Sequence, residues 1–216
     1  AFGIEMDVVK AIGSPRTDEI LDEDITDYKK DSIRQRHPLL KDKKVYVYFP
    51  TFREIDGTLT EFDPKIDWAQ MNENLTDDEV FVVARHPIMK KDFFNGSFYS
   101  RVKDYTVDPT PELLSVADVV ITDYSSIIFD ASLMNKPMLF YCPDYGEYER
   151  DFYLDYDKDL PGEIVISQNN LLEGLRRACQ NSTNEKTTVF MEKYMGACDG
   201  KSTERVVKLI ENYIKN

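Results

Sequence analysis

The sequence predicts an α/β fold with a Rossmann-like, doubly wound and mostly parallel sheet. Short runs rich in Val, Ile, Tyr and Phe alternate with longer amphipathic stretches, the pattern of strands and helices taken in turn. The 216 residues, 42% of them hydrophobic, contain no internal repeat and no low-complexity linker. Such an alternation favours parallel pairing through right-handed crossovers, with ligands at the carboxyl ends of the strands. We therefore expect a single domain over residues 1–216.

Each expected strand is a short apolar run closed by a glycine, a proline or a polar residue, all of which disfavour continuation of a strand. In chain order these runs are residues 6–12, 44–50, 79–84, 118–122, 137–141 and 163–166. The run KVYVYFP (44–50) has the clearest strand pattern and ends in its own proline.

The expected helices are amphipathic stretches between these runs: residues 28–36, 67–75, 111–116 and a stretch that opens at residue 127. The last third of the chain also has a helical pattern. Its final helix has Ser202 as an N-cap candidate. Apolar residues recur on one face of that helix: Val206, Val207, Leu209, Ile210, Tyr213 and Ile214.

The acidic composition excludes several classes of partner. The chain has 27 Lys and Arg against 40 Asp and Glu, a formal net charge of −13. DNA, RNA and anionic bilayers repel such a surface. No apolar run approaches the roughly 20 residues of a membrane span. We therefore expect a soluble protein. The three cysteines lack C-x-x-C spacing and the chain has only two histidines, so we expect no structural zinc. Reduced, intracellular thiols are the expected state of the cysteines.

Groups that suit a phosphate follow three of the expected strands, at PTFR (50–53), RHP (85–87) and TDYSS (122–126). Because the carboxyl ends of parallel strands meet at one edge of a sheet, we expect these corners to lie together. Arg53 and Arg85 offer planar forks of N–H donors. His86 can hydrogen-bond a phosphate oxygen or donate a proton to a leaving group.

The third corner has hydroxyls where many nucleotide-binding folds have glycines. Asp123, Ser125 and Ser126 lie between a strand and a helix, so the serines offer hydroxyl and backbone N–H donors at a helix start. Asp130, four residues after Ser126, lies on the same helix face, where its carboxylate can take ribose hydroxyls. The sequence predicts a diphosphate site without a glycine loop.

These residues also have simpler structural explanations. A serine at a helix start is commonly an N-cap, and an isolated histidine is more often structural than catalytic. We interpret His37, in a charged run near a helix end, as structural. The acidic, aromatic segment 144–162 lacks the glycine and glutamate of a calcium loop, so we interpret it as a loop at the surface or at the edge of the active site. No metal and no cofactor are predicted.

Six motifs run through nearly the whole chain: GSPRTDEIL, VYVYFPTFRE, ARHP, ITDYSSIIFDASLMNKPMLFY, the DFYLDY to LPG segment, and CDGKSTERVV. In order and spacing they resemble the CDP-glycerol glycerophosphotransferase family, whose members build the poly(glycerol phosphate) of bacterial teichoic acids. The TDYSS block, with an aspartate four residues further on, is the most specific of them.

The resemblance implies a GT-B architecture, in which two Rossmann-like domains face each other across a cleft. This chain matches the C-terminal domain, which holds the nucleotide donor. The resemblance makes His86 the donor-side active-site histidine and assigns Ser125 and Ser126 to the donor diphosphate. Motif position and chemistry complete the expected donor-binding set, which is Arg53, Arg85, Asp123, Ser125, Ser126, Asp130, Lys201 and Ser202.

The family also has a histidine in its N-terminal domain, in a Trp-His-Gly-type motif, as base for the acceptor hydroxyl. That motif is absent, since Trp68 is the only tryptophan and Ala69 follows it. We therefore expect the acceptor domain and any membrane contact to belong to a missing half of a parent protein at the inner face of the bacterial membrane. The implied reaction is attack of a polymer's terminal hydroxyl on the glycerol-side phosphorus of CDP-glycerol, with release of CMP. We expect this chain alone to bind the donor but to turn over poorly.

Three alternatives stay open. A relative that uses CDP-ribitol is the nearest, because a site for the diphosphate does not distinguish three carbons from five. A sugar-nucleotide glycosyltransferase domain shares the GT-B architecture. A non-catalytic nucleotide-binding module would keep the fold without needing His86. A dinucleotide-dependent oxidoreductase is disfavoured, because the chain has no G-x-G-x-x-G motif.

Overall fold

The computed structural model describes residues 9–56, 58–60, 62–86, 98–147, 154–156, 158–181 and 185–215. Its strands are β1 (Lys44–Phe49), β2 (Arg53–Ile55), β3 (Thr58–Thr60), β4 (Glu79–Val83), β5 (Val102–Asp104), β6 (Val119–Thr122), β7 (Met138–Tyr141) and β8 (Glu163–Val165). Its α-helices are α1 (Glu23–Arg36), α2 (Trp68–Asn74), α3 (Thr110–Val116), α4 (Ile127–Leu133), α5 (Gln168–Gln180), α6 (Glu185–Met195) and α7 (Ser202–Ile214). Two 3-10 helices, η2 (Pro15–Ile20) and η3 (Pro38–Leu40), flank α1.

Within these ranges six strands form one sheet in the order β5-β4-β1-β6-β7-β8, and each neighbouring pair is parallel. β2 and β3 form a separate antiparallel hairpin. Counted along the chain without the hairpin, the sheet order is 3-2-1-4-5-6, which is that of a doubly wound fold. The predicted fold class is confirmed. The direction of winding reverses between β1 and β6, and ligands bind at such a switch point.

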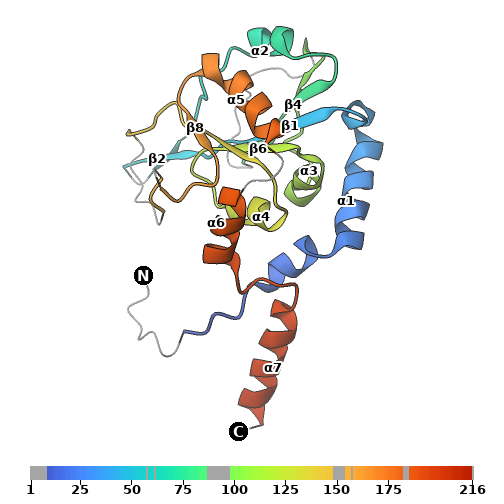
Figure 1. Ribbon diagram of the computed structural model, residues 1–216, viewed down its shortest axis with the longest axis vertical. Helices are drawn as coiled ribbons and strands as arrows, with labels where there is room; N and C mark the ends of the chain where they lie inside the picture. Colours follow the sequence, from blue (N-terminus) through green and yellow to red (C-terminus); the bar gives the residue numbers. More distant parts are fainter. Residues whose placement is uncertain are drawn as a thin grey trace.

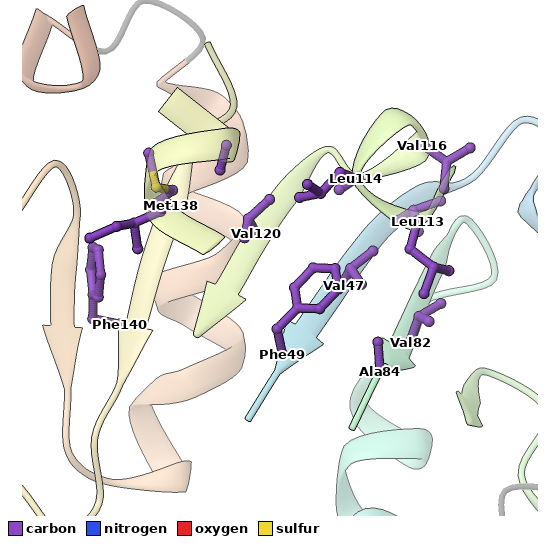
Figure 2. Close-up of a cluster of buried hydrophobic side chains, with 14 of the residues drawn as sticks. Val47, Phe49, Val82, Ala84, Leu113, Leu114, Val116, Val120, Met138 and Phe140 are labelled. Carbon is purple, nitrogen blue, oxygen red and sulfur yellow. The ribbon is translucent and has the colours of Figure 1, made fainter. Parts of the chain in front are cut away.

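Helices cover both faces of the sheet (Figure 1), because the strands are apolar on both sides. Along β1, Val45 and Val47 point into the core under α1, α3, α4 and α6, whereas Tyr46 and Tyr48 point into the core under α2 and α5. Figure 2 shows part of the first core. In it the strand residues Val47, Phe49, Val82 and Val120 pack against the α3 residues Leu113, Leu114 and Val116.

Two expectations about the N-terminal part need correction. Residues 9–12 of the expected first strand contain no strand, and residues 6–8 lie outside the described residues. A run of alternating apolar residues becomes a strand only where a sheet edge accepts it. Helix α1 begins at Glu23, five residues before the expected start, because the Asp22 carboxylate caps it by accepting from the Ile25 N–H at 3.1 Å.

The C-terminal helix α7 extends away from the sheet and contacts η2 (Figure 1). Four apolar side chains on it are exposed: Val207, Ile210, Tyr213 and Ile214. None of the described helices is long and apolar enough to cross a membrane. The three cysteines, Cys142, Cys179 and Cys198, are free thiols.

Glu79, at the start of β4, is a buried carboxylate paired with the partly exposed Arg176. Its carboxylate accepts from the Arg176 guanidinium at 2.7 Å and from the Tyr46 hydroxyl at 2.8 Å. The Arg176 hydrogen bond is the main reason that the pKa of Glu79 is lowered to about 2. A carboxyl group whose pKa is lowered in the folded state stabilises the fold at neutral pH. This contribution decreases as the pH falls below the pKa of the group in the unfolded chain and is lost as the pH passes its pKa in the folded state.

We expect Glu79→Gln to lower the free energy of unfolding at pH 7 by about 1–3 kcal/mol, because the variant leaves Arg176 without its anionic partner. At pH 3 the difference in the free energy of unfolding between variant and wild type should be less than half as large. Urea denaturation at pH 7 and pH 3 measures this difference, with the exposed Glu73→Gln as the control. A difference that is the same at both pH values would contradict the assignment.

Candidate functional site: the carboxyl edge of β4, β1 and β6

The carboxyl ends of β4, β1 and β6 lie side by side, because β1 pairs with both of the other strands. Tyr48 in β1 is level with Val83 in β4, and Phe49 is level with Thr122 in β6. Neighbouring strands in a sheet are about 4.8 Å apart. The loops that follow these three strands therefore start within a few ångströms of one another, at the switch point of the sheet.

Contacts between side chains join the three loops. The Phe52 ring meets the His86 imidazole at 5.2 Å between centroids, in an edge-to-face arrangement. Thr51 donates to the Asp123 carboxylate from its N–H (3.0 Å) and from its hydroxyl (2.6 Å). The structure thus brings together the corners that the sequence predicts to be neighbours, with Pro87 outside the described residues.

Asp123 anchors the serine corner from inside the protein. Its side chain is fully buried, and besides Thr51 it accepts from the Tyr124 N–H at 2.8 Å and pairs with Arg53 at 2.9 Å. Burial raises the pKa of Asp123, and the neighbouring guanidinium opposes this. In this structure the carboxylate holds the corner through these contacts within the protein. The prediction that Asp123 contacts the donor stays a prediction.

Arg53 is also used within the protein. Its guanidinium makes two hydrogen bonds to Asp144, at 2.6 and 3.1 Å, and one to the Thr51 carbonyl at 2.7 Å. It also stacks on the Phe62 ring at 3.5 Å, and its side chain is only 10% exposed. Arg53 thus ties the β6–α4 corner, through Asp123, to the loop after β7. Its predicted phosphate contact stays a prediction.

Arg85 is similarly committed to its surroundings. Its guanidinium forms an ion pair with Asp104 at the end of β5, its side chain is 8% exposed, and its backbone N–H donates to the Thr106 hydroxyl at 3.0 Å. These contacts hold the loop after β4 against β5. The guanidinium is paired within the protein in this structure, and the predicted phosphate contact of Arg85 stays a prediction.

Of the predicted site residues at this edge, His86, Ser125 and Ser126 have accessible side chains. His86 and Ser126 are exposed, and Ser125 is half-buried. Ser126 is the N-cap residue of α4 without making a side-chain cap, whereas the Ser125 hydroxyl oxygen accepts from the Ile127 N–H at 3.2 Å. A hydroxyl that accepts one hydrogen bond still has its own proton to donate. Since α4 has only seven residues, the hydroxyls matter more for an anion than the helix dipole does.

Asp130 lies one turn further along α4 and faces η2. Both of its oxygens accept from the Arg16 guanidinium, at 2.7 and 2.8 Å. The carboxylate is largely buried, whereas the Arg16 side chain is 68% exposed. A ribose that binds here would share the carboxylate with Arg16 or take the place of Arg16. The predicted ribose contact stays a prediction.

Asp130 also belongs to the wall of a pocket of about 280 Å³ between η2, α1, α3 and α4. The apolar part of its lining is Ile20, Pro111, Leu114 and Met134, and the polar part is Arg16, Glu19, Thr26, Lys29, Thr110 and Asp130. Sequence reasoning missed this pocket. Two of the motifs contribute to its walls, but nothing in their spacing indicates a pocket, because the walls come from four elements that meet only when the sheet is wound.

Lys201 and Ser202 lie at the start of α7, away from this edge (Figure 1). The Asp18 carboxylate accepts from the Ser202 N–H at 3.0 Å and from the Thr203 N–H at 2.7 Å. These bonds, that of Thr203 first, lower the pKa of Asp18 to about 2. In this structure the Asp18 carboxylate lies at the start of α7. The predicted donor-binding role of Lys201 and Ser202 stays a prediction.

Where the structure describes it, the acidic, aromatic segment contacts the corner between β6 and α4. The Tyr156 hydroxyl donates to the Asp123 carbonyl at 3.0 Å, and its ring lies 5.6 Å from that of Tyr124. Tyr124 in turn donates to Asp144 at 3.4 Å. The segment thus shields the buried Arg53 network from solvent, while residues 148–153 and 157 lie outside the described residues.

Comparison with known proteins identifies the family. A family model described as CDP-Glycerol:Poly(glycerophosphate) glycerophosphotransferase matches residues 1–212. The chain is 34% identical to the teichoic acid poly(ribitol-phosphate) polymerase of Bacillus spizizenii, over 97% of this chain and 34% of that protein. It is 32% identical to the teichoic acid glycerol-phosphate transferase of Staphylococcus aureus, over 97% of this chain and 56% of that protein.

Solved structures give the same result. The wall teichoic acid polymerase TagF superposes with a TM-score of 0.81 at 31% identity, over 100% of this chain and 54% of that one. The structure of the H444N variant of TagF soaked with CDPG superposes with a TM-score of 0.79 at 29% identity, over 100% of this chain and 52% of that one. This chain therefore spans about half the length, or less, of the relatives that it matches.

Proposed function

Because this chain belongs to the CDP-glycerol:poly(glycerophosphate) glycerophosphotransferase family, we propose that it is the donor-binding part of a transferase. The transferase moves glycerol phosphate from CDP-glycerol to a terminal hydroxyl of a teichoic-acid-type acceptor and releases CMP. The greater length of the relatives supports an acceptor domain elsewhere in a parent protein. That part would also provide any contact with the inner face of the cell membrane.

The observation that carries the proposal is the meeting of His86, Ser125 and Ser126 at the switch point of the sheet. These side chains are the accessible ones among the predicted residues at this edge, while Arg53, Arg85 and Asp123 fix the loops behind them. Hydroxyl donors beside an imidazole suit the oxygens of a diphosphate. A ligand at the carboxyl edge between β1 and β6 also follows the general rule for doubly wound sheets.

The nucleoside part of the donor then has a place along α4. A diphosphate at Ser125 and Ser126 sets the ribose one turn further on, beside Asp130, which accepts hydrogen bonds from hydroxyls. The pocket bounded by Asp130 continues in that direction, and its apolar walls suit a nucleobase. This arrangement leaves the alditol end of the donor near His86.

In the proposed reaction the acceptor hydroxyl attacks the glycerol-side phosphorus, and the bond to the bridging oxygen of the diphosphate breaks. Negative charge builds on the departing CMP phosphate. Hydrogen bonds from Ser125, Ser126 and a protonated His86 stabilise this charge, and such donors are worth roughly 10²–10³ each in rate. The base that takes the proton from the acceptor hydroxyl comes from the acceptor domain, so the isolated chain binds donor but turns over poorly.

Calorimetric titration of the 216-residue chain with CDP-glycerol, CDP-ribitol, CDP and UDP-glucose tests the proposal. We expect CDP-glycerol to bind, and the Ser125→Ala/Ser126→Ala double variant to weaken binding by about 10- to 100-fold, because two hydrogen bonds to charged oxygens are lost. The exposed Ser100→Ala is the matched control. Unchanged affinity in the double variant would remove the serines from the donor site.

CDP-ribitol is the second candidate donor, since relatives at 34% identity use ribitol phosphate by name. The diphosphate and nucleoside contacts are common to both donors. The same titration ranks them, and an affinity for CDP-ribitol at least tenfold above that for CDP-glycerol would reassign the substrate without changing the site.

A further inference from the structure

The pocket between η2, α1, α3 and α4 contains a lysine with little solvent exposure. The Lys29 side chain is 19% exposed, and its ammonium lies 3.0 Å from Glu19 Oε2. Within the described residues, that carboxylate is the hydrogen-bond partner found for this ammonium. Both groups line the pocket beside Ile20 and Leu114.

The stability of the fold does not account for this pair. An ion pair with an exposed partner contributes little, about 0–1 kcal/mol, and the Glu19 side chain is 66% exposed. Ordering a lysine stem against apolar walls costs conformational entropy and takes its charge partly out of water. A donor and an acceptor held side by side at the wall of an apolar pocket are, however, what recognition of a flat polar edge requires.

The pocket lining contains two ion pairs. Asp130 of α4 pairs with Arg16 of η2, and the ribose of the donor is proposed to lie beside this pair. Glu19 of η2 pairs with Lys29 of α1. The lining also contains the apolar side chains Ile20, Pro111, Leu114 and Met134. A base attached to that ribose thus meets apolar side chains on its faces and the Glu19–Lys29 pair at its edge.

We propose that the Glu19–Lys29 pair reads the hydrogen-bonding edge of the donor's nucleobase. Glu19 accepts from the 4-amino group of cytosine, and Lys29 donates to the neighbouring ring nitrogen. Uracil has a carbonyl oxygen and an N–H at these two positions, so in the same pose it sets oxygen against carboxylate and N–H against ammonium. Rejection of the wrong base by such repulsion is a common source of specificity. The inference rests on the proposed function, because it takes the nucleoside at Asp130 as given.

Titration of the full 216-residue chain with CDP and UDP tests the inference. We expect wild type to prefer CDP by about tenfold or more, the size of effect that one matched polar contact provides. Glu19→Gln removes the charge but keeps the shape, and Lys29→Met keeps the stem but removes the ammonium. Each variant should weaken CDP binding by about tenfold and reduce the CDP to UDP preference, while the exposed Glu23→Gln leaves both unchanged.

The outcomes separate the inference from the proposed function. If both variants bind CDP and UDP with the wild-type preference, the Glu19–Lys29 pair does not read the base and the inference fails, while the donor site stands. If wild type binds neither nucleotide, the proposed function fails and the inference fails with it. Thermal unfolding of each variant shows whether a loss of binding comes from a loss of fold. If one variant does not fold, the CDP to UDP preference of the other variant decides the inference.

Discussion

Replacement of Arg53 with Met is expected to lower the free energy of unfolding by about 3–5 kcal/mol, the usual cost of removing one partner from a buried ion pair. The substitution keeps most of the side-chain volume against Phe62 but leaves Asp123 buried without a cation. It also releases Asp144 from the corner. Because the same network positions Ser125 and Ser126, donor affinity should fall by at least tenfold at temperatures where the variant is still folded.

Urea denaturation and CDP titration measure the two effects of Arg53→Met. The exposed Lys65→Met, which also removes one positive charge, is the control. Burial already raises the pKa of Asp123, and loss of the guanidinium raises it further. A group with a raised pKa stabilises the fold at low pH and loses that contribution as the pH rises, so the deficit should be smaller at pH 5 than at pH 8. A stability within about 0.5 kcal/mol of wild type would contradict the anchoring role.

Much of the fold can be predicted from the sequence because its signals are local. The KVYVYF run alternates Val and Tyr, and its two faces fill two different cores under different helices. A strand that is apolar on both sides has to lie inside a sheet covered by helices. Strand order along the chain then places the corners after β1, β4 and β6 at one edge. This is why His86, Ser125 and Ser126 could be brought together without a structure.

The roles of individual charged residues could not be predicted in the same way, because role depends on partners far away in the chain. Arg53 has the chemistry of a phosphate ligand, but Asp144, 91 residues later, takes its guanidinium. Asp18, 184 residues before Ser202, occupies the start of α7. An arginine or a helix start looks the same in sequence whether a ligand or a carboxylate of the protein meets it.

The pocket beside Asp130 shows the other limit of sequence reasoning. Its walls come from η2, α1, α3 and α4, and their residues have no common motif or spacing. The GSPR sequence (13–16), which leads into η2, has the glycine and proline of a turn, and nothing in it indicates that Arg16 reaches Asp130, 114 residues later. Sites of this kind depend on tertiary contacts, whereas the strand-end corners depend on topology alone.

His86→Ala is expected to leave the fold and the affinity for CDP-glycerol nearly unchanged, while lowering the rate of glycerol phosphate transfer by about 10²–10⁴. The imidazole is exposed, so its removal takes little from the core, and the serines and the pocket still hold the donor. A group that acts mainly on the departing phosphate lowers kcat rather than binding.

The measurement is CMP release from CDP-glycerol, in the parent protein and with a teichoic-acid-type acceptor, alongside the affinity for the donor. His86→Gln is the informative companion, since its amide keeps a hydrogen bond to a phosphate oxygen but supplies no acidic proton. A rate for Gln that lies well above that for Ala assigns His86 to charge stabilisation, and equal losses assign it to proton transfer. Unchanged transfer in both variants would remove His86 from the chemistry and favour a non-catalytic nucleotide-binding module, because the fold and the serine corner serve binding equally well without it.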